Sequence, residues 1–356
     1  MGRFTHGPFN PRVNIVGLPV GNSGLPKLPT GSFGYYPYGY PRVLPNPRID
    51  ALWKYPTIGT DFTYPLSWNK VPENILVAVL AIFTFLRKPV QAPSPQCLQE
   101  HGIRGVNGPM TDPGVMWITP DMPGASIAVH PVPSNANQVG PIVLDVAPAV
   151  EQHYEITQWL KKAPTVYVNL GSLFKYDEER ANIMAQALKS LLDSTSVQVL
   201  WKMGEIDQFR VEVEGELQSH IDQERVVIRK WVEIDATALM MTGNVVCFAH
   251  HGGANSFNEA LWSGVPQVII PMWLDLYNFA QVAESIGVGV YATRGTAPAW
   301  TTEGLSEAFL RVVGKSQESR AIRNKAHTLG REAKEISGRH TAAKQISDMA
   351  SVGQGQ

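Results

Sequence analysis

The chain has 356 residues, of which 44 % are apolar, and it carries 30 basic and 31 acidic side chains for a net charge of −1. That length predicts about two domains at roughly 100–200 residues each, and the apolar content suffices for a sizeable core, which excludes global disorder. The balanced charge argues against a nucleic-acid partner, because binding to a phosphate backbone needs a basic surplus. Two cysteines, Cys97 and Cys247, are too few for a disulfide scaffold or a four-cysteine zinc site.

The sequence lacks an evident membrane segment. No apolar run reaches the roughly 18 residues that span a bilayer, and the longest candidate, Asn74–Leu86, is too short. The first residues include Pro8, Asn10 and Pro11 and do not form a continuous apolar signal segment. We therefore expect no transmembrane segment and a cytoplasmic protein.

Proline is unevenly distributed, with 23 of the 27 prolines in residues 1–150. Because proline removes a hydrogen-bond donor and fixes φ, this part cannot consist of ordinary helices and central strands. Residues 1–55 are predicted to be loop-rich, with disorder as the alternative. Pro72 and Glu73 suit a first helical turn, and the apolar residues that follow predict a helix over 74–86.

From about residue 163, short apolar strands alternate with helical segments. The predicted strands are Thr165–Leu170, Val197–Trp201, Val226–Arg229, Val245–Ala249 and Gln267–Ile270. The first is followed by a helical pattern over Glu178–Leu192, and residues 316–351 form a charged helical tail. This alternation predicts an α/β fold with a parallel sheet covered on both faces, and the loops after its strands then lie on one ligand-binding edge.

One stretch, Ala249–Leu261 (AHHGGANSFNEAL), combines several features of a binding site. It follows a predicted strand and opens a helix, and its two glycines let the backbone turn tightly and approach a ligand. Asn255 and Ser256 lie in the first turn, where free N–H groups and the helix dipole favour an anion. His251 can donate to a phosphate oxygen, and Glu259, one turn further, can accept from two sugar hydroxyls. Together they predict a diphosphate-plus-ribose site.

Other predicted strand ends add to this edge. Trp231 follows one strand and offers a flat face for a base. Gly171 and Ser172 close the first strand with a glycine and a hydroxyl, and the loop 272–278 presents Asp275.

This pattern resembles the donor-binding signature of the UDP-glycosyltransferases, and its wider sequence resembles the fungal members. The residues that carry the resemblance are Trp231, His251, Gly253, Asn255, Ser256, Glu259, Gly264, Val265, Pro266, Pro271 and Asp275. The resemblance implies the two-domain GT-B architecture, in which two Rossmann-like domains face a cleft. It would cover roughly 55–356, with residues 56–150 as the remnant of an N-terminal acceptor domain plus linker, 151–315 as the nucleotide-sugar domain and 316–356 as a helical tail.

The resemblance also implies roles for individual residues. Trp231 would stack on uracil, Glu259 would hold the ribose hydroxyls, and Asp275 would contact the donated sugar. The diphosphate would lie against residues that follow two of the predicted strands: Gly171, Ser172, His251, Gly253, Ala254, Asn255 and Ser256. The reaction would transfer a hexose, glucose by expectation, with inversion to a hydroxyl of a small apolar acceptor. The UDP-sugar would be a co-substrate, and the reaction would need no metal or cofactor.

The sequence departs from the family pattern at several points. Ile234 stands where a glutamine often follows the tryptophan, and Leu276 stands where many members carry glutamine after the aspartate. The N-terminal strand and glycine–histidine loop that supply the general base in full-length members are not found, and His6 lacks a preceding strand, so the catalytic base is unknown. The sequence therefore resembles an N-terminally truncated member.

Alternative interpretations remain beside this one. The chain could be a catalytically impaired UDP-sugar-binding module that needs a partner chain for the acceptor site, or that self-associates through the face left by truncation. His250 is interpreted as structural. An NAD-dependent oxidoreductase is disfavoured, because Gly287-x-Gly289 precedes a strand instead of linking a strand to a helix.

Overall fold

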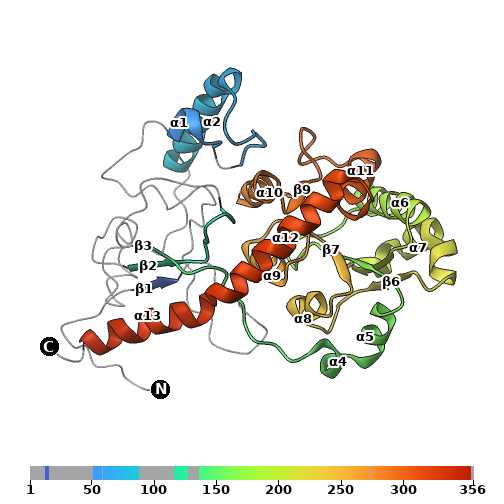
Figure 1. Cartoon of the computed structure of the whole chain (residues 1–356). Coiled ribbons are helices and arrows are strands. Elements are labelled where there is room, and N and C mark those ends of the chain that lie inside the picture. Colours follow the sequence, from blue (N-terminus) through green and yellow to red (C-terminus); the bar gives the residue numbers. More distant parts are fainter. Residues whose placement is uncertain are drawn as a thin grey trace, which may run out of the picture.

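A six-stranded parallel sheet forms the centre of the larger part of the protein (Figure 1). The computed structural model describes residues 13–15, 51–57, 59–87, 116–126, 136–273 and 275–353. The strand order is β6-β5-β4-β7-β8-β9, and each neighbouring pair is parallel. The strands are β4 (Thr165–Asn169), β5 (Gln198–Lys202), β6 (Val226–Arg229), β7 (Val245–His250), β8 (Gln267–Ile269) and β9 (Gly289–Tyr291). Their carboxyl ends therefore meet at one edge.

Helices cover both faces of this sheet, as the sequence predicts. One face carries α6 (Glu178–Ser194), α7 (Ile206–Asp222) and α11 (Thr302–Val313). The other carries α5 (Tyr154–Leu160), α8 (Ala236–Met241), α9 (Ala254–Ser263), α10 (Asp275–Ser285) and α12 (Gln317–Ile336). This three-layer arrangement confirms the predicted α/β fold class.

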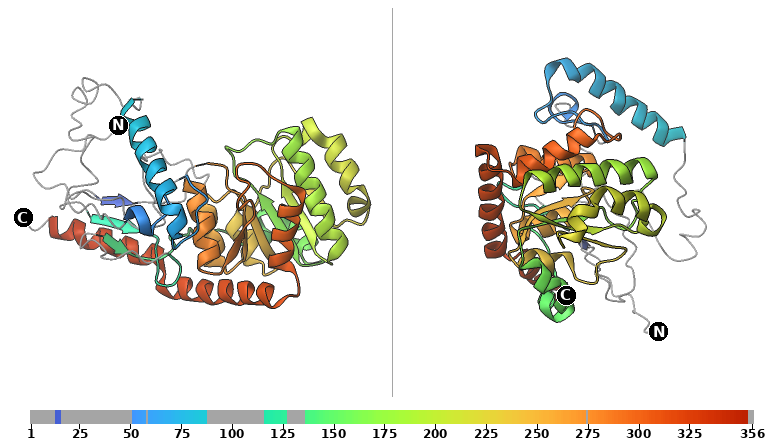
Figure 2. Two further views of the ribbon diagram at one scale, coloured as in Figure 1. Left: turned by 90° about the horizontal axis from the view of Figure 1, so that it is seen from above. Right: turned by 90° about the vertical axis from the view of Figure 1, so that its right-hand side faces the viewer.

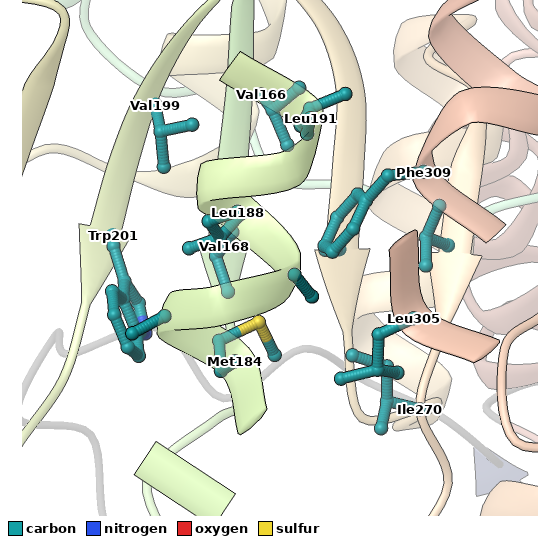
Figure 3. Close-up of a cluster of buried hydrophobic side chains, with 14 of the residues drawn as sticks. Val166, Val168, Met184, Leu188, Leu191, Val199, Trp201, Ile270, Leu305 and Phe309 are labelled. Carbon is teal, nitrogen blue, oxygen red and sulfur yellow. The ribbon is translucent and has the colours of Figure 1, made fainter. Parts of the chain in front are cut away.

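Strand β4 shows why the sheet core is apolar on both sides. Val166 and Val168 face α6 and pack against Leu188 (Figure 3). Tyr167, between them, points to the opposite face, where its ring stacks on Phe248 with 5.0 Å between the ring centroids. A strand buried on both faces needs a continuous apolar run, which is the feature that predicts this strand from sequence.

The predicted strands and helices agree closely with those observed. The strand expected over 226–229 is β6 itself, and the other predicted strands differ from the observed ones by one residue at one or both ends. The helix expected over 74–86 is α2 (Val71–Arg87). The predicted helical tail is instead two helices, α12 and α13 (Gly338–Gly353), because Ser337 adopts a left-handed conformation with φ of 53° between them.

A second, smaller sheet lies beside α13 (Figure 2) and was not predicted from the sequence. Its parallel strands, in the order β1-β2-β3, are β1 (Val13–Ile15), β2 (Met116–Thr119) and β3 (Ala136–Gln138). Helix α13 packs here through Ala342, which clusters with Ile118, Val139 and Ile142. The helix α4 (Ala149–Gln152) follows the linker between the two sheets.

The segment before α2 is attached to the large sheet domain. It comprises α1 (Ala51–Lys54) and the 3₁₀ turn η1 (Trp68–Lys70). Arg294 Nη1 donates to the Asp61 carbonyl oxygen at 3.2 Å, and Gln281 Nε2 donates to that of Thr60 at 3.5 Å. These bonds place α1 and α2 beside α10 (Figure 2).

Most of residues 1–55, predicted to be loop-rich, lies outside the described residues; the exceptions are 13–15, which form β1, and 51–55, which include α1. The predicted domain boundaries near 55, 150 and 315 stay predictions. Among the described helices, none has both the length and the apolar character needed to cross a membrane.

Candidate functional site

The predicted site residues follow strand ends at the carboxyl edge of the large sheet. Gly171 and Ser172 follow β4, and Trp231 follows β6. His251 follows β7, and Asp275 begins α10 after β8. The sheet therefore brings the predicted residues to one edge, as the parallel topology requires.

Helix α9 begins at Ala254, where the sequence predicts a helix start. Its N-cap residue, Gly253, forms no side-chain capping bond, so no side chain satisfies the N–H groups of the first turn from the N-cap position. Asn255 is exposed and Ser256 half-buried on that turn. An uncapped helix start of this kind favours an anion through its N–H groups and its dipole.

The His251 ring lies between two glycines. A β-carbon added at Gly171 would lie 2.9 Å from His251 Cε1, and one added at Gly253 would lie 2.6 Å from Nε2. Gly171 also has φ of +84°, which other residues rarely adopt. Glycine at these two positions therefore lets the imidazole lie against the backbone at the start of α9.

His251 is neutral near pH 7. Burial, together with the positive charge of Lys202, lowers the pKa of His251 to about 4. Its Nδ1 atom is buried and, within the described part of the chain, has no hydrogen-bond partner. The neutral ring can still donate one N–H to a ligand oxygen.

His250 has a structural role, as expected. Its Nδ1 accepts from Gly252 N at 3.1 Å, and its Nε2 lies 2.9 Å from Gln267 Oε1. Because Nδ1 accepts a bond, Nε2 carries the proton in a neutral ring. Burial lowers the pKa of His250 to about 3, in keeping with that neutral form.

Gly252 lets the loop after β7 pack against α10. Its φ is +93°, and an added β-carbon would lie 2.8 Å from the Leu276 carbonyl oxygen. This contact holds Asp275 at the same edge as His251. Burial raises the pKa of Asp275 above its usual range.

Glu259 lies one turn into α9 from Asn255 and is half-buried. Burial, and secondarily the charge of Asp235, raises the pKa of Glu259 to about 7. A desolvated carboxylate is stabilised by hydroxyl donors that reach it, which is the chemistry expected of a ribose contact.

The two positions that depart from the family pattern are buried in the core. Ile234 is 4 % exposed and packs with Val232 and Leu239, and Leu276 is 3 % exposed. Both side chains therefore belong to the packing of the domain. Trp231, in contrast, is 52 % exposed, as a base-stacking ring needs to be.

One residue of the site was not predicted from the sequence. Lys202, at the end of β5, donates from Nζ to the Gly171 carbonyl oxygen at 3.1 Å, and its Nζ lies 4.0 Å from the centroid of the Trp231 ring. A lysine directly after the apolar run 197–201, on a strand of this sheet, was the signal that could have revealed it.

The parallel sheet with helices on both faces and the polar residues at its carboxyl edge define a doubly wound α/β domain. The model of the family described as "UDP-glucoronosyl and UDP-glucosyl transferase" matches residues 110–323, and the chain belongs to this family. Its fold is that of the GT-B UDP-glycosyltransferases. The crystal structure of UDP-glucose: anthocyanidin 3-O-glucosyltransferase in complex with UDP aligns with a TM-score of 0.51 and 18 % identity, over 66 % of this chain and 54 % of that one.

Curated relatives extend the comparison. Glycosyltransferase sdnJ of Sordaria araneosa is 32 % identical over 322 residues, which is 83 % of this chain and 62 % of that protein. Erythritol-mannosyl-transferase 1 of Mycosarcoma maydis is 30 % identical over 127 residues, or 36 % of this chain and 20 % of that protein. The chain thus spans less than two thirds of the length of these relatives.

Proposed function

We propose that the chain binds a UDP-sugar at the start of α9 and takes part in transferring its hexose to a hydroxyl group. The observation that carries the proposal is the position of His251 between Gly171 and Gly253 at an uncapped helix start, with Glu259 one turn along. The diphosphate would accept from the α9 N–H groups and from His251. Glu259 would accept from the ribose hydroxyls, and uracil would stack on Trp231.

Departure of UDP leaves negative charge on the diphosphate as the sugar carbon is attacked. In the proposed site the helix start and the His251 N–H oppose this charge, so no metal or cofactor is invoked. An acceptor oxygen attacking from the side opposite UDP gives inversion at the sugar carbon. Asp275 would accept from hydroxyls of the donated sugar.

Glucose is our proposal for the sugar, supported by the glucosyltransferases among the solved structures that share this fold. A small apolar acceptor is supported by α2, which lies beside α10 and exposes Leu76 and Val79. The acceptor's general base is left unassigned, because the described residues before Ala149 include no histidine.

A second candidate function is supported by the length of the chain, which spans 62 % of glycosyltransferase sdnJ. If another chain supplies the acceptor side, this chain would bind UDP-sugar but depend on a partner chain, or on a second copy, for turnover. Loss of a general base costs on the order of 10²–10⁴ in rate, and loss of acceptor positioning costs as much again.

Calorimetric titration with UDP and UDP-glucose, followed by an assay of UDP release with phenol and sterol acceptors, tests both. Binding with turnover supports the transferase. Binding without turnover supports the module. Failure of UDP and UDP-glucose to bind contradicts both.

A further inference from the structure

Lys202 lies between the two ends of the proposed donor site. It is the last residue of β5, in register with Asn169 of β4 and Arg229 of β6. Gly171 and Trp231 each lie two residues beyond these partners. The Lys202 ammonium group is therefore positioned between the loop that touches His251 and the ring proposed to stack on the base.

The charge of the Lys202 side chain is not neutralised by a carboxylate of the described residues. The residue is only 9 % exposed, yet among the described residues no carboxylate forms an ion pair with it. Lys202 Nζ donates instead to the neutral carbonyl group of Gly171. Burial lowers the pKa of Lys202, an effect that the more distant Glu205 partly opposes. Keeping an unpaired ammonium group here costs folding free energy.

The donor site needs such a charge. His251 is neutral near pH 7, and the start of α9 supplies only the partial charge of a helix dipole. A diphosphate brings at least two negative charges. Within the described part of the site, Lys202 is the residue that can carry a full positive charge beside His251.

We propose that Lys202 binds the diphosphate of the donor through its ammonium group, giving up its contact with the Trp231 ring as the nucleotide enters. This inference rests on the proposed function and adds a residue to its site. The Lys202 ammonium group has two more N–H donors besides the one that donates to the Gly171 carbonyl oxygen. Its flexible four-carbon stem lets the ammonium group move the short distance from the Trp231 ring to the diphosphate. Leaving the Trp231 ring would free a stacking face for the base.

The competing explanation is that Lys202 serves only to hold Trp231 in place. The two explanations differ in which part of the nucleotide they affect. A diphosphate contact concerns UDP and is absent with uridine, whereas a support for Trp231 affects both ligands equally.

The test is calorimetric titration of UDP and of uridine into the full chain and into Lys202→Met, which removes the charge and keeps the stem. We expect UDP affinity to fall about tenfold or more, as for loss of a charged hydrogen bond, with uridine affinity changed less than about threefold. Lys202→Arg, which keeps the charge, should retain most of the UDP affinity. Lys230→Met is the matched control, because Lys230 adjoins Trp231 but is paired with Asp207 at 3.0 Å; it should bind UDP like the unaltered chain.

Equal losses for UDP and uridine in Lys202→Met would overturn the inference, as would unchanged UDP affinity. If Lys202→Met does not fold, the UDP and uridine affinities of Lys202→Gln are compared with those of Lys202→Arg. A loss for UDP alone in Lys202→Gln supports the inference, and equal losses for both ligands, or no loss for UDP, overturn it. Absence of UDP binding by the unaltered chain would instead contradict the proposed function. This outcome is distinct from the two results that would overturn the role of Lys202.

Discussion

Desolvation changes the protonation state of the residues at the proposed donor site. Burial lowers the pKa of His251 to about 4 and raises the pKa of Glu259 to about 7. In both residues it favours the neutral form over the charged form. Such perturbed groups gather where a ligand replaces lost water contacts. The site is therefore prepared for hydroxyl donors at Glu259 and for a phosphate oxygen at His251.

Glu259→Gln tests the ribose contact. Only the ionised Glu259 accepts from both hydroxyls, so UDP affinity of the unaltered chain should rise between about pH 6 and pH 8. At pH 8 the substitution should cost about 1–3 kcal/mol of binding free energy and should remove this part of the pH dependence. Calorimetry over the pH series measures both, with the exposed Glu178→Gln in α6 as control. An unchanged affinity at pH 8 would show that Glu259 does not hold the ribose.

At the scale of elements, the position of α9 depends on a close helix crossing. Gly264, the C-cap of α9, meets Gly330 of α12. A β-carbon added at Gly330 would lie 2.5 Å from Gly264 Cα and 2.7 Å from its nitrogen. Helix α12 thus supports the helix whose opposite end forms the donor site.

Gly330→Ala should therefore destabilise the protein, although alanine favours helices more than glycine does. We expect a loss of about 1–3 kcal/mol in the free energy of unfolding, since α12 must move away from α9. Urea denaturation provides the measurement. Gly215→Ala in α7 is the matched control, because its β-carbon meets no atom within 4 Å, and it should stabilise by up to about 1 kcal/mol. Equal stabilisation by both substitutions would show that the crossing tolerates a β-carbon.

The sequence predicts a helix or strand well where the residues of that segment themselves determine its structure. The buried strand β4 is a short apolar run, and α9 begins directly after the glycines at 252 and 253. The break at Ser337 was not predicted, because the left-handed conformation that Ser337 adopts there is uncommon for a residue other than glycine. The small sheet pairs residues 13–15 with 116–118, and no local pattern reveals a partner so distant.

The candidate site residues that we predict from the sequence come mainly from one local motif. His251, Asn255 and Glu259 have fixed spacing on one loop and helix, so one motif contains them. Lys202 is separated from that motif along the chain, and its role depends on a sheet order that places β5 between β4 and β6. Its burial is a tertiary property that a single lysine in a sequence does not report.

At the scale of the whole molecule, the buried histidines make stability depend on pH. The folded pKa values of His250 and His251, about 3 and about 4, lie below the unfolded value of 6.5, so their stabilising effect is lost as pH falls below 6.5. Glu259 acts in the opposite direction between 4.5 and about 7. Two histidines against one glutamate leave a net loss of stability on acidification.

We expect the free energy of unfolding to fall by about 1–2 kcal/mol between pH 6.5 and pH 5, measured by urea denaturation. His251→Asn should remove most of the loss of stability that His250, His251 and Glu259 cause together on acidification, because His250 alone then opposes Glu259. Titration of all other groups is shared by the two proteins and cancels in the comparison. The same pH slope in both proteins would contradict the assigned burial of His251.

A crystal structure of the chain with bound UDP tests the central claim most directly. We expect the diphosphate to lie against the N–H groups of Ala254, Asn255 and Ser256, with the ribose hydroxyls on Glu259. UDP bound elsewhere on the molecule, or with its ribose turned away from Glu259, would contradict it.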